Sequence, residues 1–470
     1  MQQLAVVLTA LILASSASAA VPKDPLPRRA ALGIAMGPPA QGQAEVVISE
    51  IHPGLTAQAM GLQKGDVILS AGGKAMRSNA DVVAYAGGLT AGQKVEIDVR
   101  RGGKAIKLRG KAAGRPRETY SNADVDYGAV PFRDGRLRDI LVTPKGASKP
   151  PVLFLLQGFT CASMENPNPT SAYRRLGEEL VARGIAYYRV EKPAVGDSVG
   201  DVKCTQIGYE MELDAFRSAY RHLIEARGFQ PDRIFMLGHS LGGLQAPMLA
   251  AELPPRGVAA YGTVLRNWAD YHHDVDVYQS FLFTGADAAE EAAQSEANRD
   301  IFRLFYLERL APAEIVKRNP AAAEAMRQVF SWDGGDRMFG RHYKFAQDLA
   351  HQPIIKAWRN TKSNVLALYG ESDIVALFGS DHEMIANIAD FYRPGSGKFV
   401  EIAGTDHGMG LVGNRQELRE KTIAAGAPPS GPFNPKITDI LADWIKDSMS
   451  KPPVRTTAER VIPADAPVGS

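Results

Sequence analysis

The sequence predicts an α/β protein: a mostly parallel sheet with helices on both faces and a helical cap, preceded by a small β/α domain. Three observations support this prediction. From residue 120 onward, short apolar runs alternate with segments of helical period, as expected for a parallel sheet. Residues 31–113 contain short strand-like runs separated by glycines. A long stretch rich in helix formers, residues 265–360, interrupts the alternation of strands and helices.

Length and composition exclude several classes of protein. The chain has 470 residues, enough for two or three domains, and 45% of them are hydrophobic. Its 54 Lys and Arg residues nearly balance 52 Asp and Glu residues, so no broad cationic surface for nucleic acid is expected. After residue 20, no apolar run is long enough to cross a bilayer. We therefore expect neither a nucleic-acid partner nor a stable membrane span.

The N-terminus is predicted to be a secretory signal peptide, residues 1–19. Residues 4–14 are largely apolar, and the small residues after them include Ala17-Ser18-Ala19, which fits the A-x-A cleavage pattern. The alternative interpretation is a first strand or a buried helix of the fold. We expect the protein to be exported, either to the periplasm or out of the cell.

Export affects how the two cysteines are interpreted. Unpaired thiols are uncommon in an oxidising compartment, so Cys161 and Cys204 are expected to form a disulfide. Two buried free thiols are the alternative. Two cysteines are too few for a four-thiolate zinc site, and the sequence calls for no metal and no cofactor.

The first domain, residues 31–113, carries a recognisable pattern in residues 52–76. A Pro-Gly turn, a short helix, Gly-Leu-x-x-Gly-Asp, an apolar strand and a Gly-Gly turn follow one another there. This segment resembles the core of bacterial PDZ domains. The resemblance implies that a peptide or protein C-terminus adds as a strand to an exposed edge, with its carboxylate near Leu32, Gly33 and Ile34 and a helix at 80–86 beside it. The alternative is a domain that packs on its neighbour and binds nothing.

The second domain is expected to span residues 119–449, after a flexible linker at 113–118. The Pro-rich residues 450–470 are predicted to form a disordered tail. Apolar stripes at helical spacing predict helices within 173–181, 209–223 and 437–445. Buried strands are expected at 152–156, 186–190, 234–237, 258–261, 365–369 and 399–402.

A candidate nucleophile follows the strand at 234–237. The segment Gly238-His239-Ser240-Leu241-Gly242 matches G-x-S-x-G and precedes a helix-like segment, which is the context that gives this motif its meaning. Two glycines without Cβ atoms permit the sharp turn that exposes the serine hydroxyl. A structural turn is the alternative, but the context favours Ser240 as a nucleophile.

A serine nucleophile requires a base and an acid that orients the base. Asp373 follows the strand at 365–369, and His407 follows the strand at 399–402. With these motifs in this order, residues 119–449 resemble the α/β-hydrolase family. The resemblance implies that Asp373 is the orienting acid and His407 the general base. Glu371 is the competing carboxylate, and Asp406 is expected to be a turn residue beside His407.

The resemblance also implies an oxyanion hole and a braced loop. The strand at 152–156 runs into the sequence QGFTC, so the expected amide donors are Phe159 and Leu241. A disulfide between Cys161 and Cys204 would fix this loop. The sequence after the strand at 186–190 partly matches a loop common in the family, and we assign no site residue to it.

The insertion at 265–360 resembles a cap over the active site. Its aromatic residues are candidates for pocket lining, although packing within the cap is the simpler expectation: Trp268, Trp332, Phe339 and Trp358. Residues 270–276 contain adjacent histidines and acids, which suggests a metal site. Adjacent histidines rarely face one site, so a solvated entrance to the cap is the preferred interpretation.

The sequence thus predicts an exported, carboxylesterase-like serine hydrolase. It would cleave ester or thioester bonds of a small-molecule or peptidic substrate through an acyl-enzyme. A serine peptidase of the same fold is the main alternative, because a module that captures chain ends suggests a protein substrate. A peptide-binding adaptor with an inert hydrolase domain is the non-enzymatic alternative.

Overall fold

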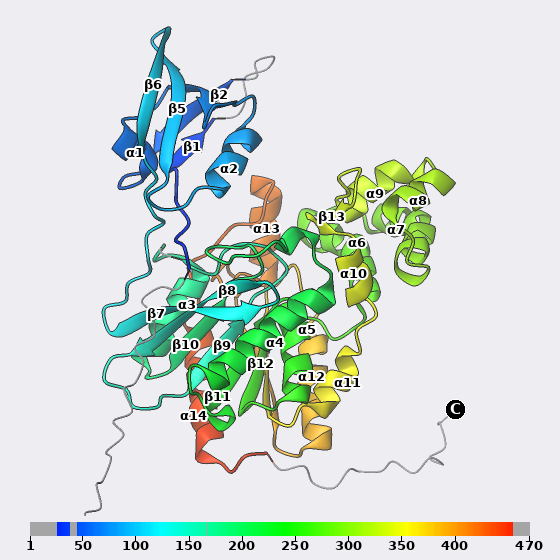
Figure 1. Ribbon diagram of the computed structural model, residues 1–470. Helices are drawn as coiled ribbons and strands as arrows, with labels where there is room; N and C mark the ends of the chain where they lie inside the picture. The colour runs from blue at the N-terminus through cyan, green and yellow to red at the C-terminus, as the bar shows by residue number, and fades with distance from the viewer. Residues whose placement is uncertain (1–25, 38–44, 167, 455–470) are drawn as a thin grey trace, which may run out of the picture.

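A computed structural model of the protein describes residues 26–37, 45–166 and 168–454 (Figure 1). The predicted signal peptide at 1–19 and most of the predicted tail at 450–470 lie outside these described residues. None of the helices in the described ranges is both long enough and apolar enough to cross a bilayer.

The N-terminal domain is built on an antiparallel sheet with the strand order β1-β2-β3-β5-β6, in which β4 pairs with β3. β5 has one face in the core, because Val95, Ile97 and Val99 are buried and alternate with more exposed residues. The elements are β1 (Ile34–Met36), β2 (Val46–Ile51), α1 (Thr56–Met60), β3 (Val67–Ala71), β4 (Lys74–Ala75), α2 (Asn79–Gly87), β5 (Lys94–Arg101) and β6 (Lys104–Lys111).

The second domain contains an eight-stranded sheet with the order β16-β15-β12-β11-β9-β10-β8-β7. Neighbouring strands from β16 to β10 are parallel, whereas β8 runs antiparallel to both β10 and β7. All six predicted strands are present, and the α/β-hydrolase fold is confirmed. The strands are β7 (Ala123–Phe132), β8 (Gly135–Pro144), β9 (Val152–Leu156), β10 (Ala186–Val190), β11 (Ile234–His239), β12 (Gly257–Tyr261), β15 (Asn364–Gly370) and β16 (Gly397–Ile402).

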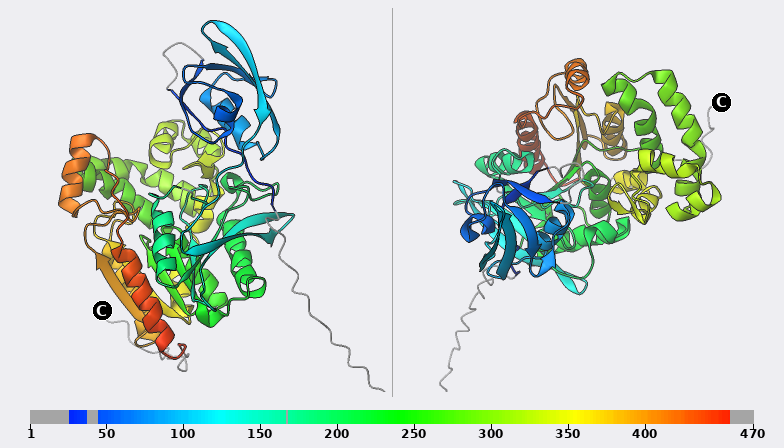
Figure 2. Two further views of the ribbon diagram at one scale, coloured as in Figure 1. Left: turned by 90° about the vertical axis from the view of Figure 1, so that its left-hand side faces the viewer. Right: turned by 90° about the horizontal axis from the view of Figure 1, so that it is seen from above.

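Helices cover both faces of this sheet (Figures 1 and 2). One buried cluster packs α3 and α14 against one face, and a second cluster packs α4, α5, α11 and α12 against the other. The predicted helical stripes all face these cores. The helices are α3 (Ala172–Ala182), α4 (Tyr209–Glu225), α5 (Gly242–Glu252), α11 (Ile354–Asn360), α12 (Gly379–Tyr392) and α14 (Lys436–Ser450), with short turns η1 (Cys204–Gln206) and η2 (Pro231–Arg233).

The insertion after β12 is mainly helical and has a hydrophobic cluster of its own. Figure 1 shows it as the yellow-green group of helices beside the sheet. Trp358 lies outside this cluster, in α11, and is fully buried against the sheet. The elements are α6 (Trp268–Thr284), α7 (Ala288–Phe302), η3 (Arg303–Leu307), α8 (Pro312–Arg318), α9 (Ala322–Phe330), β13 (Arg337–Met338), β14 (Arg341–His342) and α10 (Lys344–Leu349), and α13 (Arg415–Ala425) packs against α6.

The linker between the domains is more firmly attached than its sequence suggests. The Arg28 side chain forms ion pairs with Glu165 at 2.7 Å and Asp197 at 2.8 Å in the second domain, and it donates hydrogen bonds to linker carbonyls. Glu118, at the end of the linker, is buried and paired with the buried Arg189 at 2.7 Å. Composition alone could not predict this, because the partners lie far away in the sequence.

Candidate active site

Ser240 lies at the sharp turn between β11 and α5. Its φ is 54°, a left-handed conformation that is strained for a residue with a side chain. The Ser240 N–H donates to the Tyr261 carbonyl at 2.9 Å, which fixes the turn to β12. A Cβ on Gly238 would lie 2.3 Å from the Gly242 oxygen, and one on Gly242 would lie 2.1 Å from the Leu156 oxygen. Both motif glycines are therefore required by close backbone contacts.

Asp373 and His407 form a pair at the same edge of the sheet, after β15 and β16. His407 Nδ1 lies 2.9 Å from Asp373 Oδ2. The carboxylate is fully buried, and its Oδ1 also accepts backbone N–H groups of Val375 and Ala376, each at 2.8 Å. This arrangement holds an ionised carboxylate against the imidazole, as an orienting acid requires.

The two side chains affect each other's protonation. Burial alone would raise the pKa of Asp373, but the His407 charge and the backbone N–H groups outweigh it and lower the pKa below its usual value. Burial alone would lower the pKa of His407, but the Asp373 carboxylate outweighs it and raises that pKa. An acid that stays ionised beside a base of raised pKa is suited to proton transfer near neutral pH.

Gly262 connects the turn to this pair. It follows Tyr261, whose carbonyl holds the Ser240 N–H, and it has a φ of +58°. A Cβ at this position would lie 2.9 Å from Asp373 Oδ2 and 3.0 Å from His407 Nδ1. The acid, the base and the serine turn are therefore neighbours around one glycine. Within the described residues, His407 Nδ1 is bonded to Asp373, and no hydrogen bond involves the Ser240 hydroxyl.

The competing carboxylate Glu371 and the turn residue Asp406 both have other partners. Glu371 Oε2 accepts the Gly404 N–H at 2.8 Å, and Asp406 Oδ1 accepts the Gly410 N–H at 2.6 Å. Both therefore stabilise the turn that carries His407, which leaves Asp373 as the carboxylate facing the imidazole.

His239, the variable residue of the G-x-S-x-G motif, packs beneath His407 with a ring-centroid distance of 5.1 Å. Burial lowers the pKa of His239 to about 3, so the ring is neutral. Because the His407 carbonyl only accepts, His239 Nε2 donates to it at 2.8 Å, and Nδ1 accepts the Tyr173 hydroxyl at 2.5 Å. The motif thus supports the base-bearing loop as well as the serine. The sequence gives no local signal for this contact.

The loop after β9 lies against Ser240 and carries the expected oxyanion donor. A Cβ on Gly158 would lie 3.0 Å from Ser240 Cβ. In the described part of the chain, the backbone N–H groups of Phe159 and Leu241 donate no hydrogen bond. Two free amides beside a candidate nucleophile are what an oxyanion hole requires. A disulfide joins Cys161 in this loop to Cys204, with the Cα atoms 5.9 Å apart.

Ser240 opens into a cavity of about 480 Å³ beneath the cap. One side is mainly aromatic, with Phe159 and Trp268 stacked at a centroid distance of 6.4 Å and Phe339 nearby. Asp276 and Glu291 add carboxylates to the lining. Such a pocket suits a substrate with a bulky apolar part.

Two expectations for the cap aromatics and histidines require correction. Trp268 and Phe339 line the cavity, whereas Trp332 is buried in the cap cluster and Trp358 in the sheet domain. The solvated entrance predicted at 270–276 is wrong for His272, which is buried. Its ring binds the Tyr306 hydroxyl at 2.9 Å and the Val329 carbonyl at 3.1 Å. The polar residues at 270–276 hid the helical period of α6, and the buried face of this helix packs inside the cap.

No group of three or more His, Cys, Asp or Glu side chains lies together as a metal site within the described ranges.

Sequence analysis missed two buried charged side chains, one acidic and one basic, near the candidate oxyanion loop. Glu191 accepts the Ser163 hydroxyl at 2.5 Å, and Lys192 donates to the Gly158 carbonyl at 2.6 Å. The available signal was a charged Glu-Lys pair directly after a buried strand, β10.

Comparison with known proteins identifies the first domain. Residues 30–111 match the PDZ domain family. This segment is a PDZ domain. A stretch of 75 residues is 39% identical to the probable periplasmic serine endoprotease DegP-like of Ectopseudomonas mendocina (strain ymp). That match covers 16% of this chain and 16% of the length of the relative.

Solved structures resemble this chain over part of its length at low sequence identity. Est1E from Butyrivibrio proteoclasticus is 14% identical, with 70% of this chain and 100% of that chain covered and a TM-score of 0.42. Proline iminopeptidase of Mycobacterium smegmatis is 15% identical, with 69% and 99% covered and a TM-score of 0.40.

The PDZ domain presents β1 as an edge strand, because β1 pairs only with β2 in the described sheet. Gly33, just before β1, has a φ of +78°, and a Cβ there would lie 2.4 Å from Leu55 Cβ. Within the described residues, the backbone N–H groups of Leu32 and Gly33 donate no hydrogen bond. The start of α2 is tied to the end of β1, since Asn79 donates to the Gly37 carbonyl at 3.1 Å.

Proposed function

We propose that this protein is an exported serine hydrolase that cleaves ester or thioester bonds through an acyl-enzyme. One observation carries the proposal: Ser240 occupies a strained strand-to-helix turn that shares Gly262 with the buried pair of Asp373 and His407. The disulfide supports export, since disulfides persist in oxidising compartments.

The proposed reaction follows from these positions. Ser240 Oγ attacks the substrate carbonyl while His407 Nε2 accepts the hydroxyl proton, and Asp373 stabilises the imidazolium that forms. The amides of Phe159 and Leu241 donate to the oxyanion. Collapse of the tetrahedral intermediate expels the alcohol or thiol, which takes the proton from His407. Water then attacks the acyl-enzyme by the same route and releases the acid.

We further propose that the PDZ domain binds a peptide or protein C-terminus. The edge of β1 supports this, because an added strand could use its unpaired backbone groups, and the free amides of Leu32 and Gly33 could hold a carboxylate. Ile34 begins the strand on which the added chain would align.

The decisive test is Ser240→Ala, assayed on p-nitrophenyl esters of graded acyl length. We expect turnover to fall to background and labelling by a serine-directed fluorophosphonate to disappear, because the nucleophile is gone. Circular dichroism of the variant should match the wild type. Hydrolysis that survives the substitution would refute the assignment of Ser240.

A serine peptidase remains the competing function, because the PDZ domain suggests a protein substrate. Aminoacyl-anilides assayed beside the esters separate the two. We expect higher kcat/KM for esters. Faster turnover of the anilides would replace the esterase proposal with the peptidase one.

A further inference from the structure

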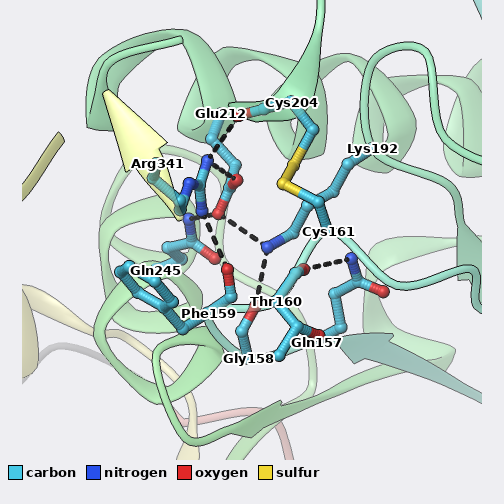
Figure 3. Close-up of a disulfide and its surroundings, with 10 residues drawn as sticks. All are labelled: Gln157, Gly158, Phe159, Thr160, Cys161, Lys192, Cys204, Glu212, Gln245 and Arg341. Carbon is cyan, nitrogen blue, oxygen red and sulfur yellow. Dashed lines mark hydrogen bonds and ion pairs between the residues drawn. A yellow bond between two sulfur atoms is a disulfide. The ribbon is translucent and has the colours of Figure 1, made fainter. Parts of the chain in front are cut away.

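A cluster of buried charges lies against the candidate oxyanion loop (Figure 3). Lys192, which follows β10, lies 3.0 Å from Glu212 of α4, and both side chains are fully buried. Arg341 of β14 reaches the other Glu212 oxygen at 2.6 Å. Gln245 of α5 donates to Glu212 at 3.1 Å. Two cations against one anion leave the cluster with a net positive charge.

The cluster binds two successive carbonyls of the loop. Lys192 Nζ donates to the Gly158 carbonyl at 2.6 Å, and Arg341 Nη1 donates to the Phe159 carbonyl at 3.0 Å. Arg341 also donates to the carbonyl of Cys204, the disulfide partner of Cys161 in the loop. Figure 3 shows these bonds converging on the loop from one side.

The first of these bonds determines where an amide points. The Gly158 carbonyl and the Phe159 N–H belong to one peptide unit, and no cis peptide occurs in the described chain. In a planar trans peptide the C=O and N–H point in opposite directions. Because Lys192 holds the carbonyl, the Phe159 N–H is directed away from Lys192, and the loop that carries this N–H contacts Ser240 at Gly158.

A cation on the carbonyl also changes the strength of the amide. Positive charge on the oxygen draws electrons through the conjugated peptide and makes the N–H a stronger donor, as in cooperative hydrogen-bond chains. A buried charge costs more than a neutral group at the same place, so a purely structural brace would not require one. Stabilising an oxyanion does benefit from such a charge.

We propose that Lys192 is a positioning residue for catalysis, which orients and polarises the Gly158–Phe159 peptide so that its N–H stabilises the oxyanion. This inference rests on the proposed serine hydrolase function. In the described part of the chain, Lys192 is not one of the residues that line the cavity at Ser240. Its influence passes through one peptide unit, with Glu212 holding its ammonium group in place and Arg341 holding Glu212.

The proposal predicts a specific pH dependence. Burial lowers the pKa of Lys192 to about 8, although Glu212 acts in the opposite direction. The charged and titratable groups facing the ammonium are Glu212 from α4 and Arg341 from the cap. Lys192 is charged below this pKa and neutral above it, so kcat/KM should decline as the pH rises through about 8.

The test compares Lys192→Met with wild type on p-nitrophenyl butyrate between pH 6 and pH 10. Removing an oxyanion donor costs about 100–1,000-fold in kcat; here the donor is retained but weakened, so we expect a loss of about 10–100-fold. KM should change by less than about threefold, because ground-state binding uses other groups. The alkaline decline should be absent from the variant.

Two further variants separate polarisation from bracing. Lys192→Arg keeps the charge and should recover part of kcat. Cys161→Ala/Cys204→Ala loosens the same loop without removing the charge, so it should retain the alkaline decline. If Lys192→Met folds and keeps both wild-type kcat and the alkaline decline, the inference is overturned.

If Lys192→Met does not fold, the wild type alone provides the answer. The rate of fluorophosphonate labelling of Ser240 should fall above about pH 8, and a rate that does not fall overturns the inference. The Ser240→Ala variant keeps the two proposals distinct. Hydrolysis independent of Ser240 refutes the hydrolase assignment, whereas Ser240-dependent hydrolysis unaffected by Lys192→Met refutes only the role of Lys192.

Discussion

Replacing Gly262 with alanine should uncouple the acid–base pair without removing any polar group. The added Cβ would lie 2.9 Å from Asp373 Oδ2 and 3.0 Å from His407 Nδ1. Comfortable contacts with carbon are near 3.5 Å or longer, so both side chains must move by roughly 0.5 Å. Misplacement of about 1 Å can cost about 100-fold in rate, and we therefore expect kcat to fall about 10–100-fold.

The substitution also strains the backbone, and the chain offers a matched control. Gly262 has a φ of +58°, and alanine in the left-handed region costs about 1–2 kcal/mol of stability. Gly228 has a φ of +76° and nothing within 4 Å of its virtual Cβ. Gly228→Ala should therefore be destabilised to a similar extent while keeping wild-type kcat.

The assay is steady-state hydrolysis of p-nitrophenyl butyrate, combined with urea unfolding of both variants. Comparison at equal fractions folded removes the effect of stability on rate. If Gly262→Ala and Gly228→Ala have the same kcat, the contact between this glycine and the acid–base pair is irrelevant to catalysis, and the reasoning is wrong.

Two further substitutions test the pair and the disulfide. Asp373→Asn removes the carboxylate that raises the pKa of His407, so that pKa should fall. In the pH profile of kcat/KM, the decline on the acid side should move to lower pH, while kcat drops about 10⁴-fold. An acid-side decline at the wild-type pH would contradict the pairing. Cys161→Ala/Cys204→Ala opens a loop with a sequence separation of 43 and should lower the free energy of unfolding by about 4 kcal/mol. Urea unfolding measures this, and a loss below about 1 kcal/mol would mean that the disulfide does not constrain the unfolded chain.

The sequence predicted the parallel part of the sheet well because such strands are buried on both faces. Residues 152–156 and 234–237 are therefore continuous apolar runs that stand out from their surroundings. The hairpin of β7 and β8 was missed because β7 is an edge strand. It is partly exposed and carries Asp124, Asp126 and Pro131, which hide its period.

The predicted nucleophile, acid and base rest on short motifs placed after strands, and these are readable in a linear sequence. The groups that hold these three side chains in place are not readable in the same way. His239 supports the His407 loop across the sheet edge, and Lys192 meets Glu212 and Arg341 only after α4 and the cap have folded over it. Contacts between distant segments leave no periodicity and no local spacing to recognise.

The Arg341 contacts also indicate which part of the cap over the candidate active site can move. Lifting the hairpin of β13 and β14 would take the guanidinium away from Glu212 and leave this buried carboxylate with Lys192 as its remaining cation, which is unfavourable. This hairpin therefore acts as a stationary wall. Substrate entry and product exit are expected along α6 and α7 instead, whose side chains border the cavity at Gln279 and Glu291. The choice of substrate would then depend on small displacements of α6 and α7, rather than on the hinged opening of a lid.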